Sequence, residues 1–339
     1  MNDVTGTERL PLGIRLLHAA RKAPDWSTMT ADELIAYRDA ENRRRSSRLG
    51  RVITGRPAGG VAIRWREVTL PDREIRVREY RPSTEDGGAL PLVLHVHGGG
   101  FVGTAVQCDW ANSHLAASLP AVVVSVEHRL LAPGTPLSAA VDDGWEVLRH
   151  VVRHAHEWGV DPTRTVVFGE STGGLIAAVA AIRAKASGQH LRAQVLVNPV
   201  TDVTETAFDH PSITRYADTP TLDAAQLRLF QRLAVPPGSD ARAVSPLLAD
   251  DLSGLAPALV VVPTVDPLAD HGRRYAERLL SSGTPARLTE HPGAPHAFLS
   301  MPGLVPQAKA ARAEITEFLR DRLAESRSFA TKSKKAGRR

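Results

Sequence analysis

One serine in this chain has the surroundings that a nucleophile needs. Ser171 stands in the segment Gly-Glu-Ser-Thr-Gly that covers residues 169–173. The apolar run Val166–Phe168 precedes this segment, and Leu175–Ala184, which is spaced like a helix, follows it. On a sharp turn from strand to helix, a serine is held in a strained conformation with its hydroxyl exposed, and flanking glycines let the two elements approach closely. The pattern predicts Ser171 to be a nucleophile.

A serine hydroxyl is a weak nucleophile at neutral pH, so it needs a histidine as base and a carboxylate that orients the histidine. In α/β sheets that carry such a serine, the chain order is serine, acid, histidine, and each residue lies on the loop after a strand. Asp266 follows the predicted strand Ala258–Pro263, and His296 follows the predicted strand Ala286–His291. We therefore expect Asp266 and His296 to meet Ser171 at the carboxyl edge of a sheet.

Three other side chains compete for these two roles. Asp202 and Asp270 could supply the carboxylate, and His291 could be the base. His291 lies at the end of its predicted strand rather than on the loop beyond it, so position and order favour His296.

A glycine-rich segment supplies a further part of such a site. The sequence His-Gly-Gly-Gly at 97–100 follows the predicted strand Pro91–Val96. Consecutive glycines let backbone N–H groups point at a substrate oxygen, because no side chain blocks the approach. The segment lacks the Gly-Lys-Ser/Thr and Gly-x-Gly-x-x-Gly patterns of phosphate-binding loops. Together with the N–H of Thr172, it is predicted to stabilise a developing negative charge.

The elements that must position these residues are predicted strands and helices, which alternate along the chain. Val61–Leu70 and Glu74–Arg81 are predicted to form an antiparallel hairpin. Further along, short β-branched runs typical of strands buried on both faces alternate with segments of helical spacing. The predicted strands are Pro91–His97, Ala121–Glu127, Thr165–Phe168, Ala193–Asn198, Ala258–Pro263 and Ala286–His291, and the predicted helices include Leu137–Trp158, Arg273–Ser282 and Ala308–Leu323. The alternation predicts the α/β class, with a mostly parallel sheet flanked by helices on both sides.

Two regions stand outside this alternation and are predicted to form a lid. Residues 1–55 contain helix-like runs, of which Ala31–Arg48 is the clearest, and no strand. Residues 200–250 contain one predicted helix, Leu222–Ala234, among proline-rich loops. We expect both regions to pack together over the catalytic face; the alternative is peripheral decoration without a role. The expected division is a cap segment at 1–55, a catalytic domain at 56–325 to which 200–250 adds a part of the cap, and a tail at 326–339.

The distribution of charge argues against a nucleic-acid partner. The whole chain of 339 residues has a formal net charge of +5. Residues 327–339 hold six lysines and arginines and no acid, so the remainder of the chain carries a net charge of −1. The tail has too little apolar content to fold and is predicted to be disordered. No basic stripe with interleaved aromatic residues runs through the body, so we expect no nucleic-acid binding.

Composition excludes further classes of protein. No run approaches 18 apolar residues, so no membrane span is expected. Residues 1–17 lack the basic start and apolar core of a secretory signal. Cys108 is the sole cysteine and cannot form an internal disulfide; we expect a loop or core thiol and a cytoplasmic location. No group of His, Cys, Asp and Glu has metal-ligand spacing, so neither a metal nor a cofactor is predicted.

Taken together, four motifs resemble those of the bacterial hormone-sensitive-lipase family of esterases in the α/β-hydrolase superfamily. They are His-Gly-Gly-Gly at 97–100, Gly-Glu-Ser-Thr-Gly-Gly at 169–174, Asp-Pro-Leu at 266–268 and His-Ala-Phe at 296–298. The resemblance covers roughly residues 60–325, and the helical N-terminus is similar to that family's cap. It implies an α/β-hydrolase fold with a helical cap, and hydrolysis of carboxylic esters with short to medium acyl chains.

The resemblance also implies a role for each motif residue. Ser171 would be the nucleophile, His296 the base and Asp266 the orienting acid. The donors to the oxyanion would be the backbone N–H groups of Gly99, Gly100 and Thr172. The residues that support the loop without taking part in the reaction would be His97 and Gly98.

The chain departs from the usual sequence of that family at three places. The family commonly has Asp and Ala where this chain has Glu170 and Thr172. The segment Tyr-Arg-Leu-Ala-Pro-Glu reads His-Arg-Leu-Leu-Ala-Pro-Gly at 128–134, and Asp-Glu-Gly reads Asp-His-Gly at 270–272. These changes fall on loops near the predicted pocket. The substrates that are usual for the family therefore do not define the substrate of this chain.

Several related activities would use the same residues. A deacetylase, an amidase, or an acyl transferase or cyclase of a biosynthetic pathway would keep the nucleophile, base and oxyanion donors unchanged. A ligand-binding module on the same scaffold would tend to lack a triad residue, whereas this chain has all three.

The expected partner is a small-molecule ester, and Ala308–Leu323 could mediate a homodimer, although packing on its own sheet is the default. Trp26 and Phe230 are expected to line the acyl pocket or else to be core aromatics.

Overall fold

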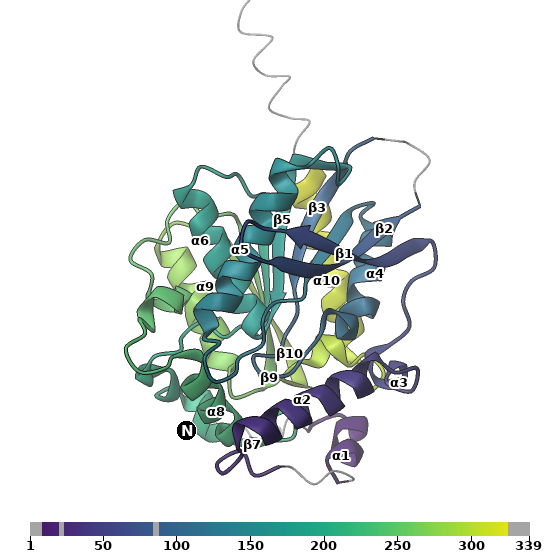
Figure 1. Cartoon of the computed structure of the whole chain (residues 1–339). Helices are drawn as coiled ribbons and strands as arrows, with labels where there is room; N and C mark the ends of the chain where they lie inside the picture. Colours follow the sequence, from purple (N-terminus) through teal and green to yellow (C-terminus); the bar gives the residue numbers. More distant parts are fainter. Residues whose placement is uncertain (1–8, 20–23, 84–87, 325–339) are drawn as a thin grey trace, which may run out of the picture.

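The described part of the chain is built around one large β-sheet. The computed structural model describes residues 9–19, 24–83 and 88–324, so the predicted tail at 326–339 lies outside the described residues. Figure 1 shows the sheet enclosed by helices. Among the described residues it has eight strands in the order β1-β2-β4-β3-β5-β6-β9-β10. These strands are β1 (Val61–Thr69), β2 (Glu74–Pro82), β3 (Leu90–Val96), β4 (Val122–Val126), β5 (Val160–Glu170), β6 (Ala193–Val197), β9 (Ala258–Val265) and β10 (Ala286–Pro295).

The strand directions confirm the predicted class. β1 and β2 form the predicted antiparallel hairpin, and β2 also runs antiparallel to β4. The other neighbouring pairs in this sheet are parallel. β4, β6 and β9 are buried along their whole length, which explains their nearly continuous apolar sequences. The carboxyl ends of the parallel strands meet at one edge, and the predicted site residues follow these ends.

Helices cover both faces of the sheet and create two apolar cores. On one face lie α5 (Leu137–Arg153), α6 (Thr172–Ala186) and α9 (Ala269–Ser281), and on the other lie α4 (Asp109–Ser118) and α10 (Gln307–Ala324). Alternate side chains of β3 enter different cores, since Leu92 and Leu94 face the first and Val93 faces the second. If β3 were shifted by one residue in its pairing with the neighbouring strands, the side chains that face the first core would face the second. Because both faces of the sheet are buried, the apolar sequence specifies one pairing register.

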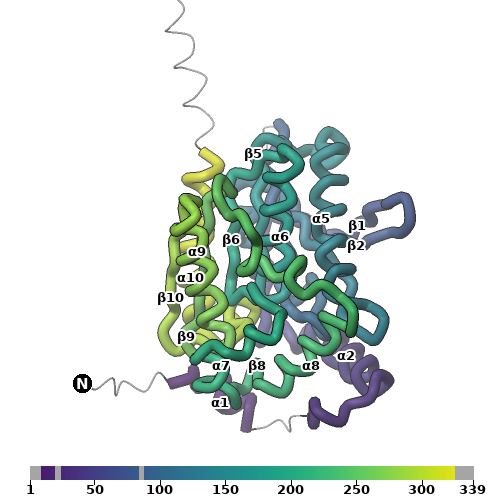
Figure 2. The backbone as a smooth tube through the Cα atoms, turned by 90° about the vertical axis from the view of Figure 1, so that its left-hand side faces the viewer, coloured from purple at the N-terminus to yellow at the C-terminus, as the bar shows by residue number. Residues whose placement is uncertain are grey.

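Two groups of segments lie together at one end of the sheet. The first is α1 (Leu12–Ala19), α2 (Ala31–Ser46) and α3 (Arg51–Thr54), called here the N-terminal helices. The second contains α7 (Pro211–Arg215), α8 (Ala224–Ala234) and a separate ladder of β7 (Asp218–Thr219) and β8 (Leu222–Asp223). Figures 1 and 2 show both groups at the lower end of the molecule. As predicted, neither group adds a strand to the large sheet.

Helix α4 was not predicted, and the bounds of several elements differ from the prediction. In α4 polar residues such as Asp109 and Asn112 are buried beside apolar ones, so its sequence lacks the apolar stripe of an amphipathic helix. β10 continues past His291 to Pro295 after an irregularity in its pairing with β9, so His296 directly follows the strand. The predicted helix at 137–158 ends at Arg153.

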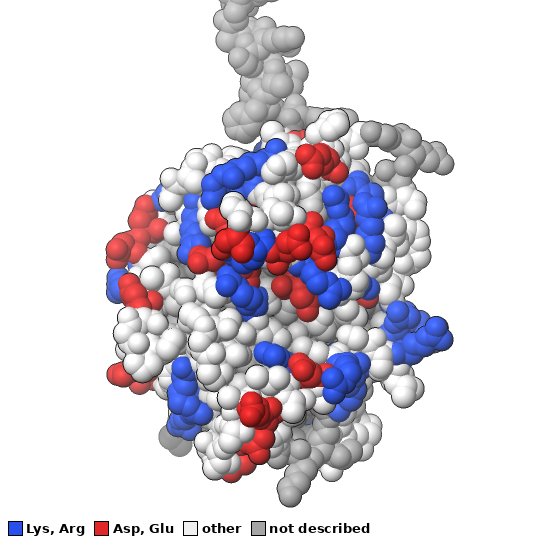
Figure 3. All heavy atoms as spheres, viewed as in Figure 1, with Lys and Arg blue, Asp and Glu red and all other residues white. Residues whose placement is uncertain are grey.

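Charged side chains of both signs are interspersed on the face shown in Figure 3. On the hairpin of β1 and β2, the buried carboxylate of Glu79 accepts hydrogen bonds from Arg64 and Arg81 at 2.5 and 3.1 Å. Such pairs neutralise charge locally. None of the described helices is long and apolar enough to cross a membrane.

Candidate active site

The turn that carries Ser171 is strained, as its sequence predicts. Ser171 joins β5 to α6 with φ 54° and ψ −117°, a conformation that residues other than glycine rarely adopt. A Cβ at Gly169 would lie 2.0 Å from the carbonyl oxygen of Gly173. A Cβ at Gly173 would lie 2.1 Å from the carbonyl oxygen of Val96. Both contacts are too short for any side chain, so the turn requires its two glycines.

Ser171, His296 and Asp266 form a continuous chain of hydrogen bonds. Ser171 Oγ lies 2.9 Å from His296 Nε2, and His296 Nδ1 lies 2.8 Å from Asp266 Oδ2. The other oxygen of Asp266 accepts a hydrogen bond from the N–H of Leu268 at 2.8 Å, which holds the carboxylate in place. Asp266 is fully buried, whereas Ser171 and His296 keep exposed fractions of 8% and 5%. With Nδ1–H donated to Asp266, Nε2 is left to accept the hydroxyl proton of Ser171.

The three competing side chains are held elsewhere. Asp202 accepts hydrogen bonds within its own loop. Asp270 pairs with Arg273 at 3.0 Å, and His291 Nε2 lies 3.4 Å from a carboxylate oxygen of Glu314. Among the described contacts, none of the three is bonded to Ser171 or His296. The fold therefore brings together the residues that position and chain order favoured.

The glycine segment lies beside Ser171. Gly99 has φ 108°, and a Cβ there would lie 1.8 Å from the carbonyl oxygen of Val102. A Cβ at Gly100 would lie 2.4 Å from the ring of Phe230. Four predicted residues line the same cavity as Ser171, namely Gly98, Gly99, Gly100 and Thr172. The backbone of this loop can therefore approach a substrate oxygen closely, as an oxyanion site requires.

His97 is buried and does not line the cavity. Its Nδ1–H donates to the carbonyl oxygen of Gly98 at 3.0 Å, and its ring stacks on that of His128 at a centroid distance of 4.3 Å. Burial lowers the pKa of His97 to about 4, and it does the same to the pKa of His128. Both rings are therefore neutral at neutral pH, as expected for side chains that support the glycine loop and take no part in the reaction.

The cavity beside Ser171 has a volume of about 210 Å³ and is bounded by segments far apart in the sequence. Its apolar wall includes Phe101, Val200, Leu222, Leu227, Phe230 and Leu268, and the N-terminal helices contribute Leu17, Tyr37, Glu41 and Arg45. Phe230 is thus a lining residue, as predicted. Trp26 is not, because it is buried against Tyr37 and Phe101 with ring centroids 5.1 and 5.6 Å away. For Trp26 the alternative, a core aromatic, is confirmed.

Three polar residues that the sequence did not single out join α2 to the glycine loop. Arg45 Nη1 donates to Gln107 Oε1 at 2.7 Å, and Gln107 Nε2 donates to the carbonyl oxygen of Gly98 at 2.9 Å. Asn42 Oδ1 accepts a hydrogen bond from the N–H of Gly103 at 3.0 Å. These partners lie far apart in the sequence, so no local pattern could have revealed them.

The glutamate before Ser171 belongs to a buried polar cluster. Glu170 Oε2 accepts a hydrogen bond from Ser300 Oγ at 2.8 Å. Glu170 Oε1 lies 3.5 Å from Cys108 Sγ and 3.7 Å from His95 Nε2. Cys108 is a core thiol, as expected, and its burial raises the pKa of the thiol well above the ordinary value. Sequence spacing showed no grouping of metal ligands, because these residues come from three separate elements.

Comparisons with known proteins agree with this geometry. The α/β-hydrolase fold family matches residues 93–300. The chain is 37% identical to the esterase LipI of Mycobacterium tuberculosis, over 71% of this chain and 76% of that protein. The chain belongs to the hormone-sensitive-lipase family of α/β-hydrolases. The family resemblance seen in the sequence is thereby confirmed.

Two further proteins match more than nine-tenths of this chain. The ethyl acetate hydrolase of Pseudomonas putida is 32% identical over 91% of this chain and 97% of its own. The crystal structure of a hyperthermophilic esterase from Pyrobaculum calidifontis has a TM-score of 0.81 and 29% identity, covering 92% of this chain and 98% of that one. The predicted fold and the predicted enzyme class, a carboxylic ester hydrolase, are confirmed at the level of the family.

Proposed function

We propose that this family member is a serine carboxylesterase that works through an acyl-enzyme. In the first half-reaction, Ser171 Oγ attacks the carbonyl carbon of the ester while His296 Nε2 takes the hydroxyl proton. The carboxylate of Asp266 holds Nδ1–H and stabilises the imidazolium that forms. His296 then gives its proton to the leaving alcohol, and the acyl group stays on Ser171.

The second half-reaction uses the same groups on a water molecule. His296 Nε2 takes a proton from the water, whose oxygen attacks the acyl carbon, and the proton then passes to Ser171 Oγ as the acid leaves. In both halves the carbonyl oxygen becomes an oxyanion. We propose the backbone N–H groups of Gly99, Gly100 and Thr172 as its donors, each worth about 3 kcal/mol in the transition state.

The size of the cavity favours short to medium acyl chains. Its volume of about 210 Å³ lies below the range of roughly 300–1,000 Å³ that is usual for drug-sized ligands. Phe230 packs on Gly100 and limits the space beside the nucleophile. We further propose that the N-terminal helices and residues 200–250 act as a cap that shapes the acyl pocket. The presence of Tyr37 and Leu227 in the lining supports this role.

The observation that carries the proposal is the unbroken hydrogen-bonded chain from Asp266 through His296 to Ser171. Ser171→Ala should lower kcat for p-nitrophenyl acetate by about a million-fold, because the nucleophile is lost. Ser281→Ala, at an exposed position of α9, is the matched control and should keep full activity. Wild-type turnover by the Ser171→Ala protein would refute the assignment.

Acyl transfer and amide cleavage would use the same side chains, so product analysis must separate them from hydrolysis. With a short ester and an excess of a competing alcohol or amine, we expect the free acid as the main product, because the named relatives hydrolyse esters. A new ester or amide as the main product would identify a transferase instead.

We also propose a cytoplasmic location, and the single, buried, unpaired thiol of Cys108 supports it. A homodimer through α10 stays a prediction.

A further inference from the structure

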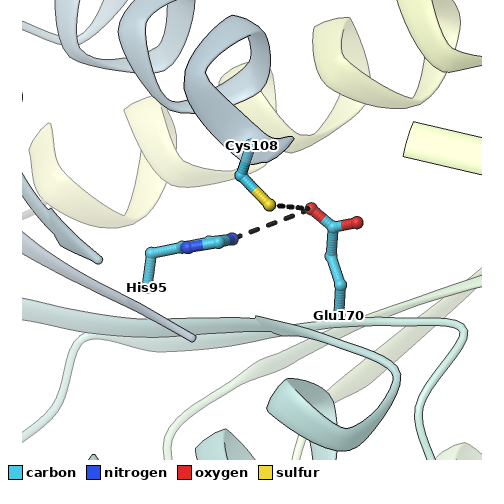
Figure 4. Close-up of side chains that lie close together, drawn as sticks. All are labelled: His95, Cys108 and Glu170. Carbon is cyan, nitrogen blue, oxygen red and sulfur yellow. Dashed lines mark hydrogen bonds and ion pairs between the residues drawn. The ribbon is translucent and has the colours of Figure 1, made fainter. Parts of the chain in front are cut away.

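Three side chains of types that metal ions favour converge behind the nucleophile turn (Figure 4). His95 comes from β3, Cys108 from the short 3-10 helix that precedes α4, and Glu170 from the end of β5. Each has an exposed fraction of 1% or less. Their ligand atoms all lie within 4.8 Å of one another.

Two of the three separations are close to those between neighbouring ligands of a tetrahedral ion. Glu170 Oε1 lies 3.5 Å from Cys108 Sγ and 3.7 Å from His95 Nε2. Zinc bonds of about 2.0–2.3 Å at tetrahedral angles place neighbouring ligand atoms about 3.3–3.6 Å apart. Small side-chain adjustments would therefore bring the nitrogen, sulfur and oxygen onto one ion.

Two buried atoms in the cluster lack a hydrogen-bond partner among the described residues, His95 Nε2 and Asn112 Oδ1. His95 Nδ1 lies 2.8 Å from Ser125 Oγ and 3.1 Å from Asn112 Nδ2. A half-turn of the Asn112 amide exchanges its oxygen and nitrogen. Asn112 Oδ1 then accepts from Nδ1–H, and Nε2 presents its lone pair to Glu170 and Cys108. Metal-bound histidines show this arrangement, in which the second ring nitrogen donates to a fixed acceptor.

The charges of the cluster also favour a cation. The side chain of Glu170 is buried, and none of the described ion pairs joins it to a lysine or arginine. A buried ionised carboxylate without a counter-charge is costly. A divalent ion balances one carboxylate and one thiolate, so the occupied site would be neutral. The thiol proton of Cys108 is released to solvent as the metal–sulfur bond forms.

We propose that His95, Cys108 and Glu170 bind a divalent cation of the Zn²⁺ class. A nitrogen, a thiolate sulfur and a carboxylate oxygen suit Zn²⁺, whereas Mg²⁺ and Ca²⁺ prefer oxygen ligands alone. Ser300 borders the fourth side, with its Oγ 3.8 Å from Cys108 Sγ. Glu170 and Ser300 line the cavity that contains Ser171, which gives an ion a route inward. The site is independent of the proposed esterase mechanism, no step of which passes through the ion.

Cobalt(II) provides a direct test, because a thiolate bound to Co²⁺ gives a near-ultraviolet charge-transfer absorption. Cys108 is the only cysteine of the chain, so the absorption can come from no other thiol. The full-length protein, stripped with a chelator, should develop this band on titration with CoCl₂, saturate at one equivalent and lose it when ZnCl₂ is added. No band at a large excess of Co²⁺ would overturn the proposal.

Variants test the individual ligands. Cys108→Ser should abolish the band. His95→Gln removes a ligand, so it should weaken Co²⁺ binding at least as much as Ser125→Ala, which removes only a neighbour of that ligand. Ser125→Ala removes a support of the His95 ring and should raise the Kd by about 10-fold to 100-fold. His114→Gln changes a histidine of α4 outside the cluster and should leave the Kd unchanged. Binding of Co²⁺ by the His95→Gln protein with the wild-type Kd would show that the cluster is not the site.

Discussion

The central sheet and the N-terminal helices contribute to the candidate site in different ways. Ser171, Asp266 and His296 each follow directly after a strand of the sheet, and each is at least nine-tenths buried. The N-terminal helices leave large apolar side chains exposed, with exposed fractions of 61% to 71% for Leu12, Leu16 and Val52. Dense packing holds the reacting groups in place, whereas the walls of the pocket come partly from a less densely packed region.

Because of this difference, we expect the strand ends to determine the catalytic rate and the pocket wall to determine which substrates are preferred. Substitutions at the strand ends should act on kcat by orders of magnitude, because they remove reacting groups. Substitutions in the pocket wall, or in the contacts that join α2 to the glycine loop, should act by about tenfold or less, because they change shape and support.

After the loss of the nucleophile itself, the largest effect is expected at the acid. Asp266→Asn should lower kcat by about 10⁴-fold, because an amide no longer holds His296 in the tautomer that accepts the serine proton. Asp270→Asn is the matched control, since Asp270 pairs with Arg273 away from the triad. Steady-state kinetics on a short p-nitrophenyl ester provide the measurement. Loss of activity in the Asp270 variant, with activity retained in the Asp266 variant, would reverse the assignment.

The next effect concerns acyl-chain preference. Phe230→Ala should raise the ratio of kcat/KM for a hexanoate ester over an acetate ester by about tenfold, because it opens space for additional methylenes. Leu229→Ala, on the same helix but outside the cavity lining, controls for general loosening of α8. An equal shift in both variants would mean that Phe230 does not set the pocket length.

A smaller effect is expected where α2 supports the glycine loop. Gln107→Ala removes the bridge between Arg45 and the carbonyl oxygen of Gly98, and should lower kcat about fivefold to tenfold with little change in KM. Arg45→Leu should act through the same bridge, so the double variant should lose little more than Gln107→Ala alone. Arg44→Leu, one residue earlier on α2, is the control. Additive losses in the double variant would show that the two residues act separately.

The smallest expected effect is on the pH dependence of stability. Burial lowers the pKa of His271 to about 4, and its neutral ring accepts from the N–H of Thr201 while donating to the carbonyl oxygen of Ala207. The unfolded chain takes up this proton near the ordinary value of 6.5, so between pH 6.5 and about 4 the unfolded state binds more protons. The stability from this group is complete above pH 6.5 and is lost as the pH falls towards 4.

Denaturant unfolding at a series of pH values measures this dependence. His271→Gln should reduce the slope of the unfolding free energy against pH by about one proton in that window. A slope unaltered by His271→Gln would contradict a neutral buried ring.

The sequence predicted the triad because each member comes on the turn or loop after a predicted strand, and the strands can be recognised where short apolar runs alternate with segments of helical spacing. It did not predict α4, where buried Asp109 and Asn112 hide the apolar stripe. The contacts of Asn42 and Gln107, and the cluster around Glu170, depend on side-chain directions in elements far apart in the sequence. Such contacts leave no local signal, and for the same reason the sequence left open whether Trp26 lines the pocket or packs in the core, where the structure places it.

Covalent labelling followed by peptide mass spectrometry tests the central claim most directly. The protein is treated with a short alkylphosphonate ester, which loses p-nitrophenolate as the serine oxygen bonds to phosphorus; it is then digested and searched for the site of modification. The account predicts one adduct, on Ser171, in the wild-type protein, at a rate lowered strongly by Asp266→Asn. An adduct on another residue, or an unmodified Ser171 in a protein whose ester hydrolysis has been abolished by the reagent, would contradict it.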